Sequence, residues 1–387
     1  MTTKQMDVFG APTPSGAGRP ANGYTLTSIV LHWAIAGLIF SGAALGAYMV
    51  RLSISPAKLR FFSYHKWIGV TIFLVAVVRL LWRATHPAPE LPPSLPRWER
   101  MAAKAGHLAL YALIFMVPVS GWLTSSAHGF QTVYFGVLPL PDILEKNKEL
   151  AGRLETVHFA LNKTLLILAF MHAGAAFKHH FIDRDDVLKR MLKPGKWMLI
   201  LALLAGPAGL SAAPLNDEIA RGTSNIDFTA FQLGAPLRGS FTRFDADVRL
   251  NEKYPEKSRA KIIVYIDGID AGADDATIEV KRKTWFDAVN YPKAEFVSTS
   301  VNALGNDKYR VAGKLTIKGR TRDVAAPVSA ARLKDAWLIE GRFIVKRLDF
   351  NIGEGAWAGT DTVADEVEVS FKLHVLDAKT NKRGREE

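Results

Sequence analysis

Residues 155–181 read ETVHFALNKTLLILAFMHAGAAFKHHF and place two histidines, His158 and His172, in one long apolar stretch. Such a stretch can cross the ~30 Å hydrocarbon core of a membrane as a single helix. The histidines are 14 residues apart, which on a helix corresponds to ~21 Å of rise and a net rotation of only about 40°. They therefore lie on one helix face, near opposite ends of the span.

Three more apolar stretches of spanning length precede this one, and a shorter one follows it. The four long spans cover about residues 26–50, 61–82, 105–125 and 156–178, and the shorter one runs from Trp197 to Ala213. Their lengths are those of transmembrane helices. The sequence thus predicts an all-α membrane four-helix bundle at 25–182, followed by a fifth hydrophobic segment at 197–213.

The basic residues indicate how the bundle is oriented. Residues 1–213 carry 21 Lys and Arg against 10 Asp and Glu, whereas residues 214–387 carry 28 against 27. Within the first half, the tail and the loops 83–104 and 178–196 hold 12 basic residues, and the loops 51–60 and 126–155 hold 6. Basic loops stay on the cytoplasmic side. We therefore expect a flexible cytoplasmic tail at 1–24 and a basic cytoplasmic linker at 183–196, and this placement explains the net charge of +12 without any nucleic-acid partner.

The fifth segment, KWMLILALLAGPAGLSAAPL (196–215), follows a basic cluster and ends in small residues, as a signal peptide does. Pro214 directly follows the one suitable cleavage site, at 211–213, and should disfavour cleavage. We interpret the segment as an uncleaved membrane anchor, with cleavage as the alternative. In both cases residues 214–387 reach the outer side of the membrane.

Residues 214–387 contain short segments in which apolar and polar residues alternate between Gly, Asp and Asn turns. The clearest are SNIDFTAF (224–231), AKIIVYIDGI (260–269), AEFVSTSVNAL (294–304), YRVAGKLTIKG (309–319), WLIEGRFIVKRLDF (337–350) and EVEVSFKLHVL (366–376). Many short strands predict an all-β sandwich or a closed antiparallel barrel. One face of each strand would line a lumen, and the candidate lumen residues are Ile226, Phe228, Leu315, Ile317, Phe343 and Val345. Inward apolar residues also fill small barrels that bind nothing.

Two further histidines, His32 and His65, lie near the starts of the first two spans. A haem held by two histidines in a bundle needs both at one depth on different helices. Since successive spans alternate in direction, His32 matches His172 at the inner side and His65 matches His158 at the outer side. The sequence predicts two haem b groups stacked across the membrane, and the absence of cysteine excludes covalent attachment and thiolate ligation.

Other roles remain open for individual residues. An intramembrane histidine can instead make a helix contact or relay protons. His107 begins the third span on the inner side and could replace His32 or His172. Arg79, 14 residues beyond His65, should lie near the inner haem, with a haem propionate or the lipid headgroups as its partner. Solvated positions are expected for the remaining histidines, which are His86, His128, His179, His180 and His374.

Four stretches resemble the bacterial cytochrome b561 family: SIVLHWAIAG (28–37), YHKWIGVTIFLVAVVRLLWR (64–83), AGHLALYALIF (105–115) and the segment 155–181. The resemblance covers about residues 24–192. It implies a bacterial inner-membrane protein with two b haems that exchanges electrons with membrane quinone, and it assigns the iron ligands to His32, His65, His158 and His172. Some members of the family resemble superoxide oxidases, which pass an electron from periplasmic superoxide to ubiquinone.

The second half resembles the YceI-like family of lipocalin-type barrels, which enclose a polyisoprenoid chain or a quinone tail. The matching stretches are SNIDFTAFQLGAPLRGSF (224–241), FDAVNYPKAEFVSTSV (286–301), YRVAGKLTIKGRTRDVAAPV (309–328) and DTVADEVEVSFKLHVL (361–376). This resemblance covers about residues 221–376 and implies an isoprenoid lipid as ligand.

Together these features predict transmembrane electron transfer through two haems, between a periplasmic redox partner and membrane quinone, with a tethered periplasmic barrel that binds an isoprenoid or a quinone. If superoxide is the donor, Arg60 and Lys66 at the outer rim could attract it, although Lys66 could equally anchor its helix in the headgroups. Two alternatives stay open: a quinol-oxidising cytochrome with a periplasmic acceptor, and a membrane-anchored isoprenoid-binding or transfer protein with a haem sensor. Neither the oligomeric state nor enzymatic turnover follows from the sequence.

Overall fold

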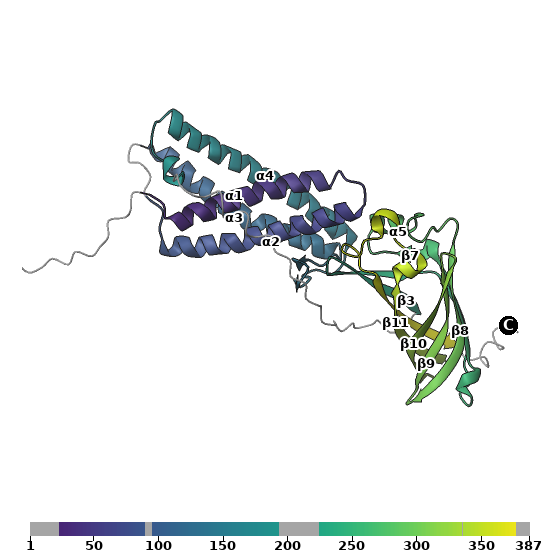
Figure 1. Cartoon of the computed structure of the whole chain (residues 1–387). Helices are drawn as coiled ribbons and strands as arrows, with labels where there is room; N and C mark the ends of the chain where they lie inside the picture. The colour runs from purple at the N-terminus through teal and green to yellow at the C-terminus, as the bar shows by residue number, and fades with distance from the viewer. Residues whose placement is uncertain (1–22, 90–94, 193–223, 335, 377–387) are drawn as a thin grey trace, which may run out of the picture.

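The computed structural model describes residues 23–89, 95–192, 224–334 and 336–376, which form a helical bundle and a curled β-sheet (Figure 1). The expected tail, apart from its last two residues, lies outside the described residues. So do the end of the basic linker, the fifth hydrophobic segment at 197–213, and both ends of the region 214–387.

Four helices form the bundle: α1 (Leu26–Met49), α2 (Pro56–Thr85), α3 (Arg97–Ala127) and α4 (Lys148–Phe181). All four are long and apolar enough to cross a membrane. Large apolar side chains such as Leu81 and Phe170 are exposed on their outer surfaces, as expected of faces that meet lipid. The predicted membrane bundle is confirmed.

Helices α2, α3 and α4 begin earlier than the predicted spans, and polar capping residues set the starts of α2 and α4. The Ser55 side chain accepts a hydrogen bond from the Lys58 backbone N–H, and Pro56 occupies the first turn of α2. The Asn147 side chain accepts from the Leu150 N–H at the start of α4. These caps lie outside the apolar stretches from which the spans were predicted.

Neighbouring helices in the chain pack side by side, α1 on α2, α2 on α3 and α3 on α4. The loop between α3 and α4 carries a small hairpin of β1 (Val133–Tyr134) and β2 (Leu138–Pro139). This hairpin and the α1–α2 turn lie at the end of the bundle that faces the sheet (Figure 1). We call it the sheet end.

The second part is one antiparallel sheet of ten strands in the order β5-β6-β8-β9-β10-β11-β12-β3-β4-β7. The strands are β3 (Asn225–Gln232), β4 (Ala235–Phe241), β5 (Phe244–Arg249), β6 (Arg259–Tyr265), β7 (Ile269–Asp270), β8 (Lys293–Gly305), β9 (Lys308–Ile317), β10 (Arg320–Arg332), β11 (Ala336–Lys346) and β12 (Glu366–Leu376). A short helix, α5 (Asp274–Val280), and the 3₁₀ turns Lys189–Met191, Pro255–Lys257, Ile266–Gly268, Arg347–Phe350 and Gly355–Trp357 complete the elements. The predicted lipocalin-like antiparallel fold is confirmed.

The sheet curls so that its two edges approach each other without forming a ladder between β5 and β7 in the described residues. The chain crosses this seam itself, because β4, which lies next to the edge strand β7, leads into β5 at the other edge through Thr242 and Arg243. Two backbone bonds join the crossing to the β6–β7 turn, from the Thr242 N–H to the Gly268 carbonyl and from the Tyr265 N–H to the Arg243 carbonyl. The result is a half-open barrel with an enclosed inner face.

Three hairpins are closed by two-residue turns whose residues both have positive φ, at 233–234, 306–307 and 318–319. Turns of this geometry match the twist of the strands that they join. Gly234 needs glycine for a second reason: a Cβ there would lie 2.5 Å from the carbonyl oxygen of Gly136 in the bundle's hairpin. This β3–β4 turn is therefore in close contact with the sheet end of the bundle.

Arg347 organises the loop between β11 and β12. Its side chain is 2% exposed and its guanidinium donates to five backbone carbonyls, those of Ala364, Ile352, Gly353, Gly359 and Val363. Burial lowers the pKa of Arg347, and the nearby Asp365 carboxylate opposes this shift. The loop is thereby fixed over a core cluster of Trp285, Leu315, Val345, Phe350, Ile352, Trp357 and Val363.

Candidate cofactor site and adjoining cavity

Two histidine pairs bridge the bundle, each joining α4 to one of the first two helices. The rings of His65 on α2 and His158 on α4 lie 6.2 Å apart between centroids and are nearly perpendicular, at 88°. The rings of His32 on α1 and His172 on α4 are also 6.2 Å apart, at 66°. The structure thus brings together the same residues that the spacing along α4 and the helix directions had paired.

Both histidines of the sheet-end pair have a partner for Nδ1. His65 Nδ1 lies 3.0 Å from the Gly42 carbonyl oxygen on α1, and His158 Nδ1 lies 3.1 Å from the Val117 carbonyl oxygen on α3. A carbonyl can only accept, so both rings carry their proton on Nδ1 and leave Nε2 with a lone pair. Sequence reasoning missed these partners, because nothing in the sequence shows which helix carbonyl faces a ring.

Glycines on the neighbouring helices allow each ring of this pair to lie close to the backbone of the helix beside it. A Cβ on Gly46 would lie 3.1 Å from His65 Cε1, and one on Gly121 would lie 3.0 Å from His158 Cε1. On the other side of His158, Asn162 donates from Nδ2 toward Nε2 at 3.0 Å. The rings are therefore confined by backbone on one side.

The second pair has a different neighbourhood. His107 on α3 lies 5.2 Å from the ring of His172. Arg79 on α2 donates from Nε to the Tyr111 hydroxyl at 3.1 Å, and its guanidinium lies 5.7 Å from the centre of that ring. Tyr111 is thus a partner of Arg79 that the sequence did not reveal.

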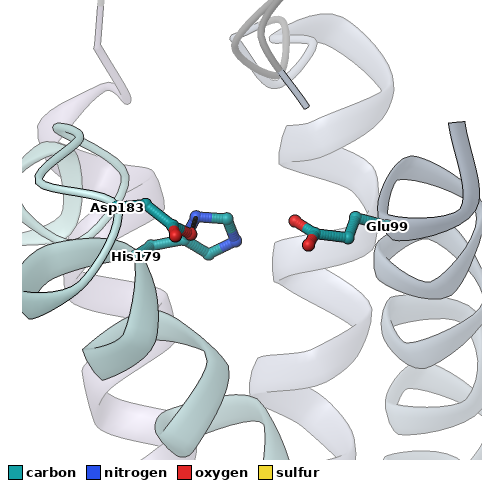
Figure 2. Close-up of side chains that lie close together, drawn as sticks. All are labelled: Glu99, His179 and Asp183. Carbon is teal, nitrogen blue, oxygen red and sulfur yellow. Dashed lines mark ion pairs between the residues drawn. The ribbon is translucent and has the colours of Figure 1, made fainter. Parts of the chain in front are cut away.

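A cluster of His179, Asp183 and Glu99 lies at the other end of the bundle (Figure 2). Lys178 Nζ lies 3.0 Å from Glu99 and 2.9 Å from Asp183, and His179 Nδ1 is bonded to Asp185 at 2.8 Å. These ion pairs tie α3 to the end of α4 and account for the acidic groups without a metal. The expectation of a solvated His179 was wrong, since only 17% of its side chain is exposed.

The sheet encloses a large apolar cavity of about 1900 Å³ that continues to the sheet end of the bundle. All six candidate lumen residues line it: Ile226, Phe228, Leu315, Ile317, Phe343 and Val345. His65 and His158 line the same cavity. Arg60, expected at an open rim, instead donates to Thr362 Oγ1 at 2.6 Å and pairs with Asp361.

Comparison with known proteins divides the chain as the structure does. Residues 23–194 match the prokaryotic cytochrome b561 family, and residues 218–375 match the YceI-like domain. Cytochrome b561 homolog 2 of Escherichia coli (strain K12) is 40% identical over 170 residues, which are 44% of this chain and 90% of that protein. The probable superoxide oxidase CybB of Yersinia pestis is 26% identical over 179 residues, 44% of this chain and 95% of that protein.

Among solved structures, BcnA of Burkholderia cenocepacia is 36% identical and covers 39% of this chain and 96% of its own, with a TM-score of 0.39. The match to the E. coli relative extends over nearly all of that protein, and the family match at residues 23–194 contains all four helices of the bundle. This chain therefore belongs to the prokaryotic cytochrome b561 family, whose members carry b-type haem, and it continues into a YceI-like domain.

Proposed function

We propose that this protein carries electrons across a bacterial inner membrane on two b-type haems, one held by His65 and His158 and one by His32 and His172. The curled sheet would lie in the periplasm and bind an isoprenoid lipid or a quinone. The observation that carries the proposal is the equal spacing of the two pairs, 6.2 Å between ring centroids in each.

This spacing fits a shared metal ion. Two imidazoles bound to one ion through nitrogens at about 2 Å, with about 1 Å more from each nitrogen to its ring centre, have centroids about 6 Å apart. His107 and His172 are closer, at 5.2 Å. The spacing therefore favours His32 over His107 as the partner of His172.

The surroundings of the sheet-end pair fit the same role. A ligating histidine usually donates its second N–H to a carbonyl, which fixes the tautomer and the ring orientation. His65 and His158 do so toward Gly42 and Val117. Asn162, which now contacts His158 Nε2, would turn aside when that nitrogen binds iron.

Haem supplies one-electron redox chemistry, and the protein supplies ligation, orientation and charge. At the His32–His172 pair, we propose Arg79 as the cation that would pair with a haem propionate. Its guanidinium, held by Tyr111, could accept a propionate as well. We propose this pairing in preference to the lipid headgroups because Arg79 is half-buried.

The arrangement of the two parts supports the proposed orientation. The sheet lies against the end of the bundle where α1 turns into α2 (Figure 1), and the basic loops lie at the opposite end. His65 and His158 line the cavity that joins the sheet to this end of the bundle. If basic loops are cytoplasmic, His65 and His158 face the periplasm. Arg60 is already paired with Asp361, and Lys66 donates to the Phe130 carbonyl, so neither is a free attractant for superoxide.

A reduced-minus-oxidised spectrum with haem quantification tests the proposal. We expect two haems per chain, both with the spectrum of bis-histidine b haem. A single haem per chain would contradict the paired geometry. Rapid mixing of the oxidised protein with superoxide then tests the donor: a rise of the α-band supports superoxide, and no rise favours quinol as donor with a periplasmic acceptor.

Gly121→Ala should perturb the sheet-end site while retaining its haem. The new Cβ would lie 3.0 Å from His158 Cε1, so the ring must shift by a few tenths of an ångström. We expect a changed low-spin EPR signal from one of the two haems. Gly152→Ala on the same helix as His158 is the matched control, since a Cβ there meets nothing within 4 Å. Identical EPR spectra for the two variants would show that the contact has no role.

A further inference from the structure

The cavity of about 1900 Å³ is lined by both parts of the protein, and the contacts between them determine its shape. From the bundle come residues around the His65–His158 pair, among them Gly42, Gly46 and Phe62. From the sheet come the apolar residues of its inner face. We call the end of the curled sheet that lies against the bundle its mouth.

An apolar contact lies at the centre of the mouth. Ile54, in the α1–α2 turn, and Leu59, on the first turns of α2, pack against the core cluster that contains Trp285 and Phe350. The same cluster includes residues from the loop that Arg347 fixes. The bundle thus completes a core that belongs mainly to the sheet.

Polar contacts surround this apolar centre. Arg60 donates to Thr362 and pairs with Asp361. Lys148 Nζ lies 2.5 Å from Asp274 Oδ2, and the Lys148 ammonium lowers the pKa of that carboxyl. The ion pairs are solvent-exposed and contribute little by themselves. They lie where the mouth meets the bundle, as does the close approach of the Gly234 turn to the bundle's hairpin.

Two buried indole N–H groups lining the cavity have no hydrogen-bond partner among the described residues. They belong to Trp122 on α3 and Trp285 in the mouth cluster. Buried donors are nearly always paired in native proteins, so an unpaired donor at the wall of a cavity points to an acceptor within the cavity, either water or a ligand. A bound molecule with oxygen acceptors at the mouth would satisfy Trp285.

We propose that an isoprenoid quinone or quinol binds across the two parts, with its tail along the inner face of the sheet and its oxygen-bearing ring at the mouth. There the Trp285 N–H donates to a ring oxygen, and the ring faces the His65–His158 end of the bundle. The cavity exceeds the ~300–1,000 Å³ of ordinary ligand sites, which leaves room for a long tail as well as a prosthetic group. This inference rests on the proposed function. It gives the sheet, docked on the bundle, the role of holding the quinone.

Trp285→Phe tests the position of the ring, because it keeps the aromatic surface and removes the N–H. With the full-length protein, we expect the affinity for a ubiquinone with two isoprenoid units to fall about three- to tenfold, the range of one lost hydrogen bond. Binding of squalene, an isoprenoid without oxygen, should not change. The matched control is Trp337→Phe. Trp337 also lines the cavity, but it lies at the start of β11, beside the turn that joins β10 to β11. Equal losses in the two variants, or a loss for squalene, would overturn the assignment.

Cross-linking tests the docked position independently. The chain has no cysteine, so Arg60→Cys with Thr362→Cys introduces the only two thiols, and a short bismaleimide should join them in membrane vesicles. Arg60→Cys with Asp307→Cys is the control, because Asp307 lies at the opposite end of β9 from Ile317, which packs on the mouth cluster. Equal cross-linking of both pairs, or of neither, would overturn the docking. If the cross-link fails but the variants retain two haems, the docked position is wrong and the proposed function stands. Absence of haem from the unmodified chain would contradict both the proposed function and this inference.

Discussion

His158→Ala is expected to remove one of the two proposed haems and to leave the other intact. His158 is the α4 member of the sheet-end pair, and a bis-histidine haem that loses one axial ligand is no longer held by its bundle. His172 lies 14 residues further along α4, about four turns away, so its pair should be undisturbed. Losing only the hydrogen-bond partner of a metal ligand lowers metal affinity about 10–100-fold, and losing the ligand itself should lower it further. The haem content per chain should therefore fall by roughly half.

The measurement is haem content by the pyridine haemochrome method, combined with a redox titration of the purified full-length variant. His65→Ala should give the same loss and leave the same residual potential, since the two residues would hold one iron. His128→Ala is the matched control, because His128 lines the same cavity but has no ring contact with another histidine among the described residues. Loss of both haems, or of neither, in His158→Ala would refute the pairing. A His107→Ala protein with one haem would reopen the choice of ligand at the other pair.

Sequence reasoning was sufficient to predict which rings lie close together, because their positions depend on two regular quantities. Helix rise and rotation fix the relation between His158 and His172, and alternation of helix direction fixes which of His32 and His65 lies at each depth. Neither quantity depends on side-chain packing. The partners of the rings do depend on it: the carbonyls of Gly42 and Val117 are like those of any helix residue until the helices pack.

The sheet shows a similar division. Strands with clear alternation, such as β9 and β12, were predicted at nearly their observed bounds. The central strand β10 (Arg320–Arg332) was missed, since it begins with charged residues and contains Pro327, which is unusual inside a sheet. Pairing with β9 and β11 on both sides holds it in the extended form. Its structure comes from its neighbours rather than from its own pattern.

Docking of the sheet on the bundle could not be predicted at all. Arg60 appeared in the sequence as a rim cation, and its partners Asp361 and Thr362 are some 300 residues away in the chain. Ile54 and Leu59 both lay in the predicted loop 51–60. Only the fold shows that these residues complete a core in the other domain.

Arg347→Met is expected to destabilise the sheet domain by about 3–5 kcal/mol, because each buried carbonyl left without a donor costs about 1–3 kcal/mol. Methionine keeps about the length of the apolar part of the arginine side chain but donates no hydrogen bond, so five buried or half-buried carbonyls would lose their partner together. The contact of the guanidinium with the Trp285 ring, at 5.7 Å, would also be lost. The loop that carries Trp357 and Val363 should then loosen first, because no other side chain spans it so completely.

Thermal unfolding of the full-length protein, followed by tryptophan fluorescence and near-ultraviolet circular dichroism, measures this effect. For a domain of this size, the loss corresponds to a fall in melting temperature of about 10 °C. Arg342→Met on β11 is the matched control, since Arg342 is exposed, and it should shift the melting temperature little. Arg347→Lys separates charge from geometry: lysine keeps the charge, but its three donors cannot reproduce the guanidinium fork. If Arg347→Lys is as stable as the unmodified protein, buried charge rather than the fork of hydrogen bonds holds the loop. Since this loop also supplies Asp361 and Thr362 to the mouth, Arg347→Met should weaken the cross-link between positions 60 and 362 even below the melting temperature.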